Sequence, residues 1–111
     1  MATYMLMARY SQSALKAIIE TGSDREAASR QAIEAAGGKL IGFYGMFGQE
    51  YGLAMIVEMP GHAEYIGAVA PAISSGGFES YKTIPLYTSA DVKKSIPIAK
   101  KVRNVYKPPG A

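Results

Sequence analysis

The stretch Lys39–Met59, KLIGFYGMFGQEYGLAMIVEM, decides the fold of this chain. It reads as two strands, Lys39–Phe47 and Tyr51–Met59, because β-prone residues flank a polar, glycine-containing turn at Gly48-Gln49-Glu50. A hairpin of two antiparallel strands is therefore the first element that the sequence predicts.

The second strand of this hairpin is apolar on both sides. Leu53 and Met55 point to one face, Ala54 and Ile56 point to the other, and Glu58 is its one charged residue. An antiparallel sheet with one face in water should alternate apolar and polar residues. We therefore expect both faces of this sheet to be covered.

The remaining elements surround the hairpin in a regular order. We expect two further strands, Thr3–Tyr10 and Phe78–Tyr87, and helices over Ser11–Glu20, from near Asp24 to Gly37-Gly38, and over His62–Ser74. Strand, helix, strand, strand, helix, strand is the order of an α+β, ferredoxin-like split βαβ fold with a four-stranded antiparallel sheet.

The helix expected over His62–Ser74 has one apolar stripe in its sequence. The stripe consists of Ile66, Val69, Ala70 and Ile73 at helical spacing. Pro71 lies inside the same segment and is expected to kink or shorten the helix.

Two helices of a split βαβ unit cover only one face of its sheet, so the other face needs a second cover. A bare apolar face would exceed what soluble monomers expose. A second copy packed sheet to sheet supplies this cover with closed two-fold symmetry. The sequence thus predicts an obligate homodimer with a barrel-like interior, the dimeric α+β barrel arrangement.

The C-terminal segment differs in composition from the rest. We divide the chain into a domain over residues 1–88 and a helical and extended tail over 89–111. Thr88-Ser-Ala-Asp91 indicates the cap of a short helix, Pro97 a restart of helix, and Lys107–Gly110 an extended end. Six of the twelve lysine and arginine residues follow Asp91, and all nine acids precede Lys93.

This basic tail permits more than one interpretation. It could contact nucleic acid or an anionic surface. No RGG run, zinc module or RNP aromatic signature accompanies it, so nucleic acid is not the expected partner. A lid or strap fits its composition better.

Composition excludes several classes of protein. The 111 residues contain no Cys and one His, which excludes disulfides, thiolate sites and multi-histidine metal sites. We expect no metal and no cofactor. The longest aliphatic run, Leu53–Val57, is far too short for a membrane span, and Met1–Tyr10 lacks an early basic residue, so a cytoplasmic protein without a membrane partner is expected.

Motifs along most of the chain resemble one family. Gly38-Lys-Leu-Ile-Gly-Phe-Tyr44, Gly48 with Tyr51, and Met55-Ile-Val-Glu-Met-Pro60 resemble the GYD-domain family, which belongs to the dimeric α+β barrel superfamily. The chain departs from the signature at Gly52, where the family pattern has Asp. The resemblance implies the fold and dimerisation. Relatives in the superfamily include cofactor-independent monooxygenases, lactone isomerases, haem-handling enzymes and non-catalytic members.

Glu58 and His62 are the candidate acid–base residues. Glu58 would favour its neutral form if the sheet face around it were enclosed, and at a strand end it would instead be a solvated rim charge. Arg9, at the end of the first strand, is its expected partner. His62 begins a helix and is either a general base or an exposed helix-start residue.

Tyrosines supply the candidate ligand-binding residues. Several phenols converging in a cavity would bind an aromatic or polar–apolar molecule, but tyrosine is also enriched at dimer interfaces. We expect Tyr44 to line the cavity, because small Gly42 on the same strand face leaves room beside the ring. Tyr51 and Tyr81 are weaker candidates for the same cavity.

Three hypotheses of function remain. The first is a homodimeric protein that binds a small molecule in its interior. The second is an enzyme acting on a phenolic or lactone-like substrate, with Tyr44 in the cavity, Glu58 or His62 as base and Arg9 steering an anion. The third is a structural or assembly protein that docks a partner through the tail.

Overall fold

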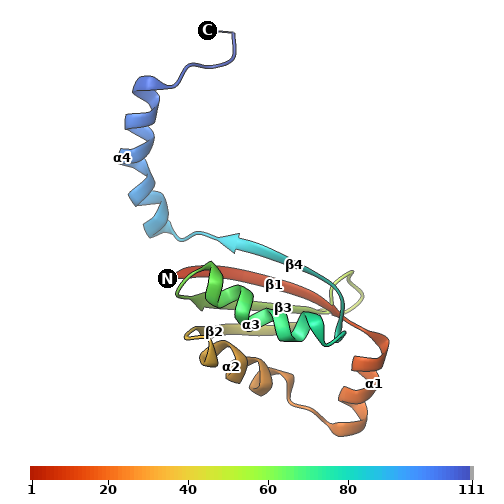
Figure 1. Cartoon of the computed structure of the whole chain (residues 1–111). Coiled ribbons are helices and arrows are strands. Elements are labelled where there is room, and N and C mark those ends of the chain that lie inside the picture. Colours follow the sequence, from red (N-terminus) through yellow and green to blue (C-terminus); the bar gives the residue numbers. More distant parts are fainter. Residues whose placement is uncertain (111) are drawn as a thin grey trace.

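The computed structural model describes residues 1–110 and contains one four-stranded antiparallel sheet. Its order is β2-β3-β1-β4, and the described residues also form four helices (Figure 1). This arrangement confirms the predicted α+β, ferredoxin-like split βαβ fold. The elements are β1 Ala2–Tyr10, α1 Gln12–Thr21, α2 Arg25–Ala35, β2 Lys39–Gly45, β3 Leu53–Met59, α3 His62–Ser74, β4 Phe78–Leu86 and α4 Ser89–Val105.

The hairpin strands β2 and β3 stop short of the predicted turn. The Met46 backbone N–H donates to the Gly52 carbonyl at 2.9 Å, so the chain leaves the sheet before Phe47. Tyr51 consequently lies in the turn, and the expectation that it belongs to the strand was wrong.

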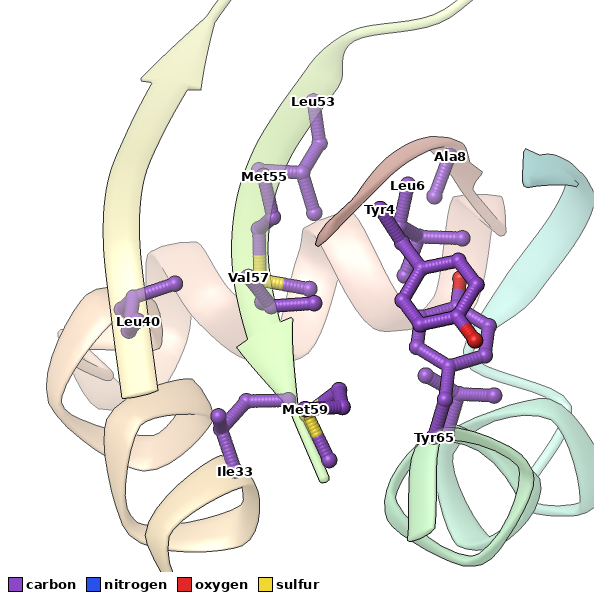
Figure 2. Packing of buried hydrophobic residues seen from close by; sticks show 11 residues of the cluster. Tyr4, Leu6, Ala8, Ile33, Leu40, Leu53, Met55, Val57, Met59 and Tyr65 are labelled. Atoms are coloured by element: carbon purple, nitrogen blue, oxygen red, sulfur yellow. The ribbon is translucent and has the colours of Figure 1, made fainter. Parts of the chain in front are cut away.

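Helices α2 and α3 cover one face of the sheet, and the hydrophobic core lies beneath them (Figure 2). Each core strand contributes alternate residues: Tyr4, Leu6 and Ala8 from β1 are buried, while the residues next to them are half-buried or, at Arg9, exposed. The whole of the core cluster is Tyr4, Leu6, Ala8, Ile33, Leu40, Leu53, Met55, Val57, Met59, Tyr65 and Val69.

The opposite face of the sheet, here called the open face, has no helix over it. The strand register places Met5 beside Ile56 and Ile84, and Met7 beside Ala54 and Lys82. Tyr44 lies opposite Ala54 on the same face. Met5, Met7, Ala54, Ile56 and Ile84 are all half-buried in the single chain. The open face is therefore apolar at its centre and uncovered.

The buried stripe of α3 differs from the predicted one. Tyr65 and Val69 are buried, whereas Ile66 is 61% exposed. The bulk of Tyr65 fills the space above β1, which turns the helix by about one residue relative to the expectation. Pro71 does not shorten α3, because it lies in the last turn and the helix continues to Ser74.

The C-terminal helix is longer than predicted. α4 runs without interruption through Pro97 for 17 residues, so the expectation of a short helix and a restart was wrong. Thr88 and Asp91 form a complete capping box at its start. Proline costs one backbone hydrogen bond there, and in an exposed helix water can bond the freed carbonyl.

α4 points away from the sheet and does not fold over it (Figure 1). The radius of gyration is 18.1 Å, against about 13 Å for a compact chain of this length. The tail is therefore not a lid or strap on its own chain.

Candidate functional site

The residues predicted to share one site lie in three separate places. Tyr44 and Glu58 belong to strands β2 and β3 and lie on the open face. His62 begins α3 and contacts the core on the covered side. Arg9 lies at the far end of β1. The structure thus brings Tyr44 and Glu58 onto one surface, places Arg9 at the opposite end of that surface from Glu58, and places His62 on the covered side.

Tyr44 is placed by a glycine. The edge of its ring occupies the space where a side chain at Gly42 would begin: a Cβ there would lie 2.7 Å from the Tyr44 Cε2 atom. The ring is nevertheless 62% exposed, because nothing covers the open face. A flat, accessible phenol beside an apolar surface is suited to stack against an aromatic molecule.

Glu58 lies at the other end of the same surface. In the sheet register it stands between Thr3 of β1 and Lys39 of β2. Four residues separate it from Ala54, the partner of Tyr44, which corresponds to about 13 Å along the strand. Tyr44 and Glu58 are therefore too far apart to touch the same atom of a small ligand, but both could contact an elongated one.

Arg9 does not pair with Glu58 as predicted. Its Nε lies 3.3 Å from the Glu79 carboxylate, and its Nη1 donates to the Glu50 carbonyl at 3.4 Å. Because β1 and β3 are antiparallel, the end of β1 lies beside the start of β3. Six residues of β1 separate Arg9 from Thr3, the neighbour of Glu58, or about 20 Å.

Arg9 instead borders a hollow at the end of the sheet. The hollow has a volume of about 770 Å³ and lies between the start of α1 and the β2–β3 turn. Gln12, Gln49 and Glu50 also line it. Within residues 1–110, Arg9 is the one basic residue that lines the hollow, and its pairing with Glu79 leaves no free cation there to hold an anion.

His62 belongs to a cluster of hydroxyl and aromatic groups that the sequence did not reveal. Its Nδ1 is hydrogen-bonded to the hydroxyl of buried Tyr4. The Tyr4 ring stacks on Tyr65 with centroids 4.3 Å apart (Figure 2), and the Tyr65 hydroxyl lies 2.7 Å from the Thr83 Oγ1. In the sequence, the one sign of this cluster is the spacing of His62 and Tyr65, which places both residues on one side of a helix.

Burial affects the titration of one member of this cluster, Tyr65. Desolvation raises the pKa of the Tyr65 phenol above its usual 10.0, although the hydrogen bond with Thr83 partly opposes it. The phenol therefore stays neutral at physiological pH. Within residues 1–110 no buried polar side-chain atom lacks a hydrogen-bond partner, so the cluster is a satisfied structural network.

Tyr81 lies on the covered side of β4, because it stands opposite core residue Ala8 in the register. It is 48% exposed at the sheet edge. The structure thus places Tyr81 away from Tyr44, on the other face of the sheet.

Across residues 1–110, no three His, Asp or Glu side chains are arranged to hold a metal ion. In the same range, no helix combines the length and the apolar character needed to cross a bilayer.

Comparison with known proteins gives one family. No curated protein matches the chain. The GYD domain family model matches residues 4–96, which include all of the sheet except the first two residues of β1, and the first half of α4. The match covers most of the 111 residues, and the chain therefore belongs to the GYD domain family.

Proposed function

We propose that two copies of this chain pair through their open faces and bind a small aromatic or polar–apolar molecule between the sheets. The observation that carries this proposal is the apolar, uncovered surface around Met5, Met7 and Ile56, with the Tyr44 ring lying against Gly42 at its side. An exposed apolar face of this kind is typical of an interaction surface in a soluble protein.

A second copy is the occupant that best suits this face. Its centre is apolar, and the charged residues that the register places on it stand at its margins: Lys39 and Glu58 at one end, Arg9 at the other and Lys82 at the β4 edge. An apolar core with a polar rim is the usual anatomy of a protein interface. Two-fold pairing matches this patch with itself and leaves the rim charges in water.

Tyr44 provides the specificity of the interior. Its ring is fixed on one side by Gly42, so its hydroxyl and its other side remain available to a ligand. Apolar walls with a few placed polar groups are the common composition of small-molecule sites. The ligand class that fits is a small ring with a polar substituent.

A fluorescent naphthol tests the binding. The chain has no Trp, so the probe can be excited where the protein does not absorb. We expect saturable binding to the wild type and a loss of about 10-fold or more in affinity for Tyr44→Ala. Tyr87→Ala, which removes a more exposed phenol outside the sheet face, is the control and should bind normally. Equal affinity for all three proteins would contradict the proposed site.

A catalytic use of the same interior is the second candidate, and the position of Glu58 on the open face favours it. If a second copy encloses the open face, the Glu58 carboxyl lies next to one end of an elongated ligand bound there. Proton exchange at an acidic carbon of a bound phenol or lactone, followed by NMR in deuterated water, should then be lost in Glu58→Gln and kept in His62→Ala. Exchange that is unchanged in Glu58→Gln would reject this role.

A further inference from the structure

The C-terminal helix α4 stands free of the chain that carries it. None of its residues is buried, and no other helix or strand packs along it within residues 1–110. It leaves the end of β4 after a link of only two residues, Tyr87 and Thr88, and extends for about 25 Å. Figure 1 shows it pointing away from the sheet and both covering helices.

The two halves of α4 have opposite character. At 100° per residue, one half of the helix carries apolar side chains and the other carries lysines. The half with most of the apolar side chains, here called the apolar half, carries Val92, Ile96, Ile98, Ala99, Val102 and Val105, together with Asp91, Ser95 and Arg103. The lysine half carries Lys93, Lys94, Lys100 and Lys101. Val102, near the middle of the apolar half, is 51% exposed, and Ile96, at its edge, is 48% exposed.

A helix of this pattern requires a partner, because exposed isoleucine and valine stabilise nothing on their own. Helix propensity also indicates a partner, because an isolated helix of 17 residues with an internal proline is only marginally stable in water. The apolar half therefore indicates a docked state, with the lysines at the rim of the contact.

Charge complementarity identifies the partner. Every acid of the chain precedes Lys93, and residues 1–86 hold eight acids against six bases. The helix from Lys93 onward is purely basic. The rest of its own chain, residues 1–86, is acidic and is here called the body. The body lies behind α4, and the link of two residues is too short for α4 to fold back onto it. A second copy of the chain presents the same acidic body.

A membrane surface fits less well. Helices that lie in the lipid interface bury large side chains such as Trp, Phe and Leu, whereas the apolar side chains of α4 listed above are Val and Ile with one Ala. These smaller, β-branched side chains suit close packing against protein. Nucleic acid would use the lysines but would leave the apolar half exposed.

We propose that α4 is an arm that packs across the body of the second copy, with its apolar half inward and its lysines beside acidic side chains. This inference rests on the proposed dimer. Leu86, the last residue of β4, stands opposite Thr3 on the open-face side of the register, so a second copy on that face lies next to the point where α4 begins. Each chain then contributes one arm to the other.

Isotope-filtered NMR on a mixture of labelled and unlabelled full-length chains tests the arm directly. We expect intermolecular NOEs from the methyl groups of Ile96 and Val102 to residues of the body. NOEs between open-face residues such as Met5 and Ile56 report separately on the paired sheets. Open-face NOEs without α4 NOEs would overturn the arm and keep the dimer. NOEs from α4 only to a second α4 would also overturn it.

Variants provide an independent measurement. Ile96→Ser/Val102→Ser should raise the dimer dissociation constant about 10-fold or more, and the conservative Ile96→Leu/Val102→Ile should leave it near the wild-type value. Reversal of charge in Lys100→Glu/Lys101→Glu should weaken the dimer, whereas Lys100→Arg/Lys101→Arg should not. An unchanged constant in the serine variant, or binding of the wild type to phosphatidylserine vesicles that dissociates the dimer, would overturn the proposal.

Discussion

Two glycines near the hairpin illustrate how single residues constrain this fold. A Cβ added at Gly38 would contact the sulfur of Met59 and lie 2.7 Å from the Glu58 carbonyl oxygen. Met59 is fully buried, so neither neighbour can move freely. At Gly52, by contrast, a Cβ would meet nothing within 4 Å.

We therefore predict that Gly38→Ala destabilises the protein by about 1–3 kcal/mol through overpacking, while Gly52→Ala stays within about 0.5 kcal/mol. Urea unfolding followed by circular dichroism measures both. Equal midpoints for the two variants would show that Gly38 does not lie against Met59 as described.

The bond between Tyr4 and His62 allows a second prediction. His62→Ala removes the partner of a buried hydroxyl and should cost about 1 kcal/mol. Tyr4→Phe made in the His62→Ala background should cost little more, because the unpaired hydroxyl disappears with it. The double-mutant cycle measures this coupling in urea. Additive costs in the cycle would mean that the two groups do not interact.

At the level of residues, local patterns predicted that Tyr44 shares a strand face with Gly42 and missed the contact between Tyr4 and His62. Gly42 and Tyr44 lie two apart on one strand, so their proximity follows from the period of a strand alone. Tyr4 and His62 are 58 residues apart, and their contact depends on how α3 lies over β1. Arg9 and Glu79 are also far apart in the sequence, and their pairing depends on how β1 and β4 meet, so it was not predicted.

The start of α4 is the element whose stability depends most clearly on pH. The Asp91 carboxylate accepts hydrogen bonds from the Thr88 backbone N–H at 2.9 Å and from its hydroxyl at 3.2 Å. These bonds, the backbone one first, lower the pKa of Asp91 from its ordinary 3.8. A lowered pKa stabilises the cap above pH 3.8 and loses that contribution as the pH falls through the folded value.

We predict that the first turn of α4 frays at acid pH and is intact at neutral pH. Carbon chemical shifts of residues 89–93 should move toward coil values as the pH drops below 3.8, and Asp91→Asn should weaken the turn at neutral pH. Thr88→Ser keeps the capping hydroxyl and is the matched control. Helical shifts that persist in Asp91→Asn would contradict the role of the cap.

Elements with strong local signals were predicted well, and those that depend on context were not. The glycine-bounded hairpin and the helix His62–Ser74 agree with the sequence pattern. The continuation of α4 through Pro97 was missed, because a proline is tolerated where no packed neighbour needs the lost hydrogen bond. The stripe on α3 was shifted, since the size of Tyr65 decided which side turned inward.

At the scale of the whole molecule, the main feature is the open face of the sheet. Its sheet has helices on one side only, and Ile56 lies near the centre of the other side. We predict that Ile56→Lys leaves the fold intact and separates the dimer, because a charge would be buried there on pairing. Ile19→Lys, on exposed α1, is the control and should remain associated. A dimer that persists in Ile56→Lys would place the interface elsewhere.

From the sequence alone, the lack of apolar–polar alternation in β3 predicted that both faces of the sheet are covered. The sequence did not predict that α4 extends away from the body. No residue type signals this position, which follows from the lack of packing contacts between α4 and its own chain within residues 1–110.

Sedimentation velocity of the wild-type chain at micromolar concentration tests the pairing of open faces most directly. We predict a single folded species of twice the 11.8 kDa chain mass that dissociates only on further dilution. A well-folded species of 11.8 kDa at that concentration would contradict the dimer, the enclosed interior around Tyr44 and the exchanged arm together.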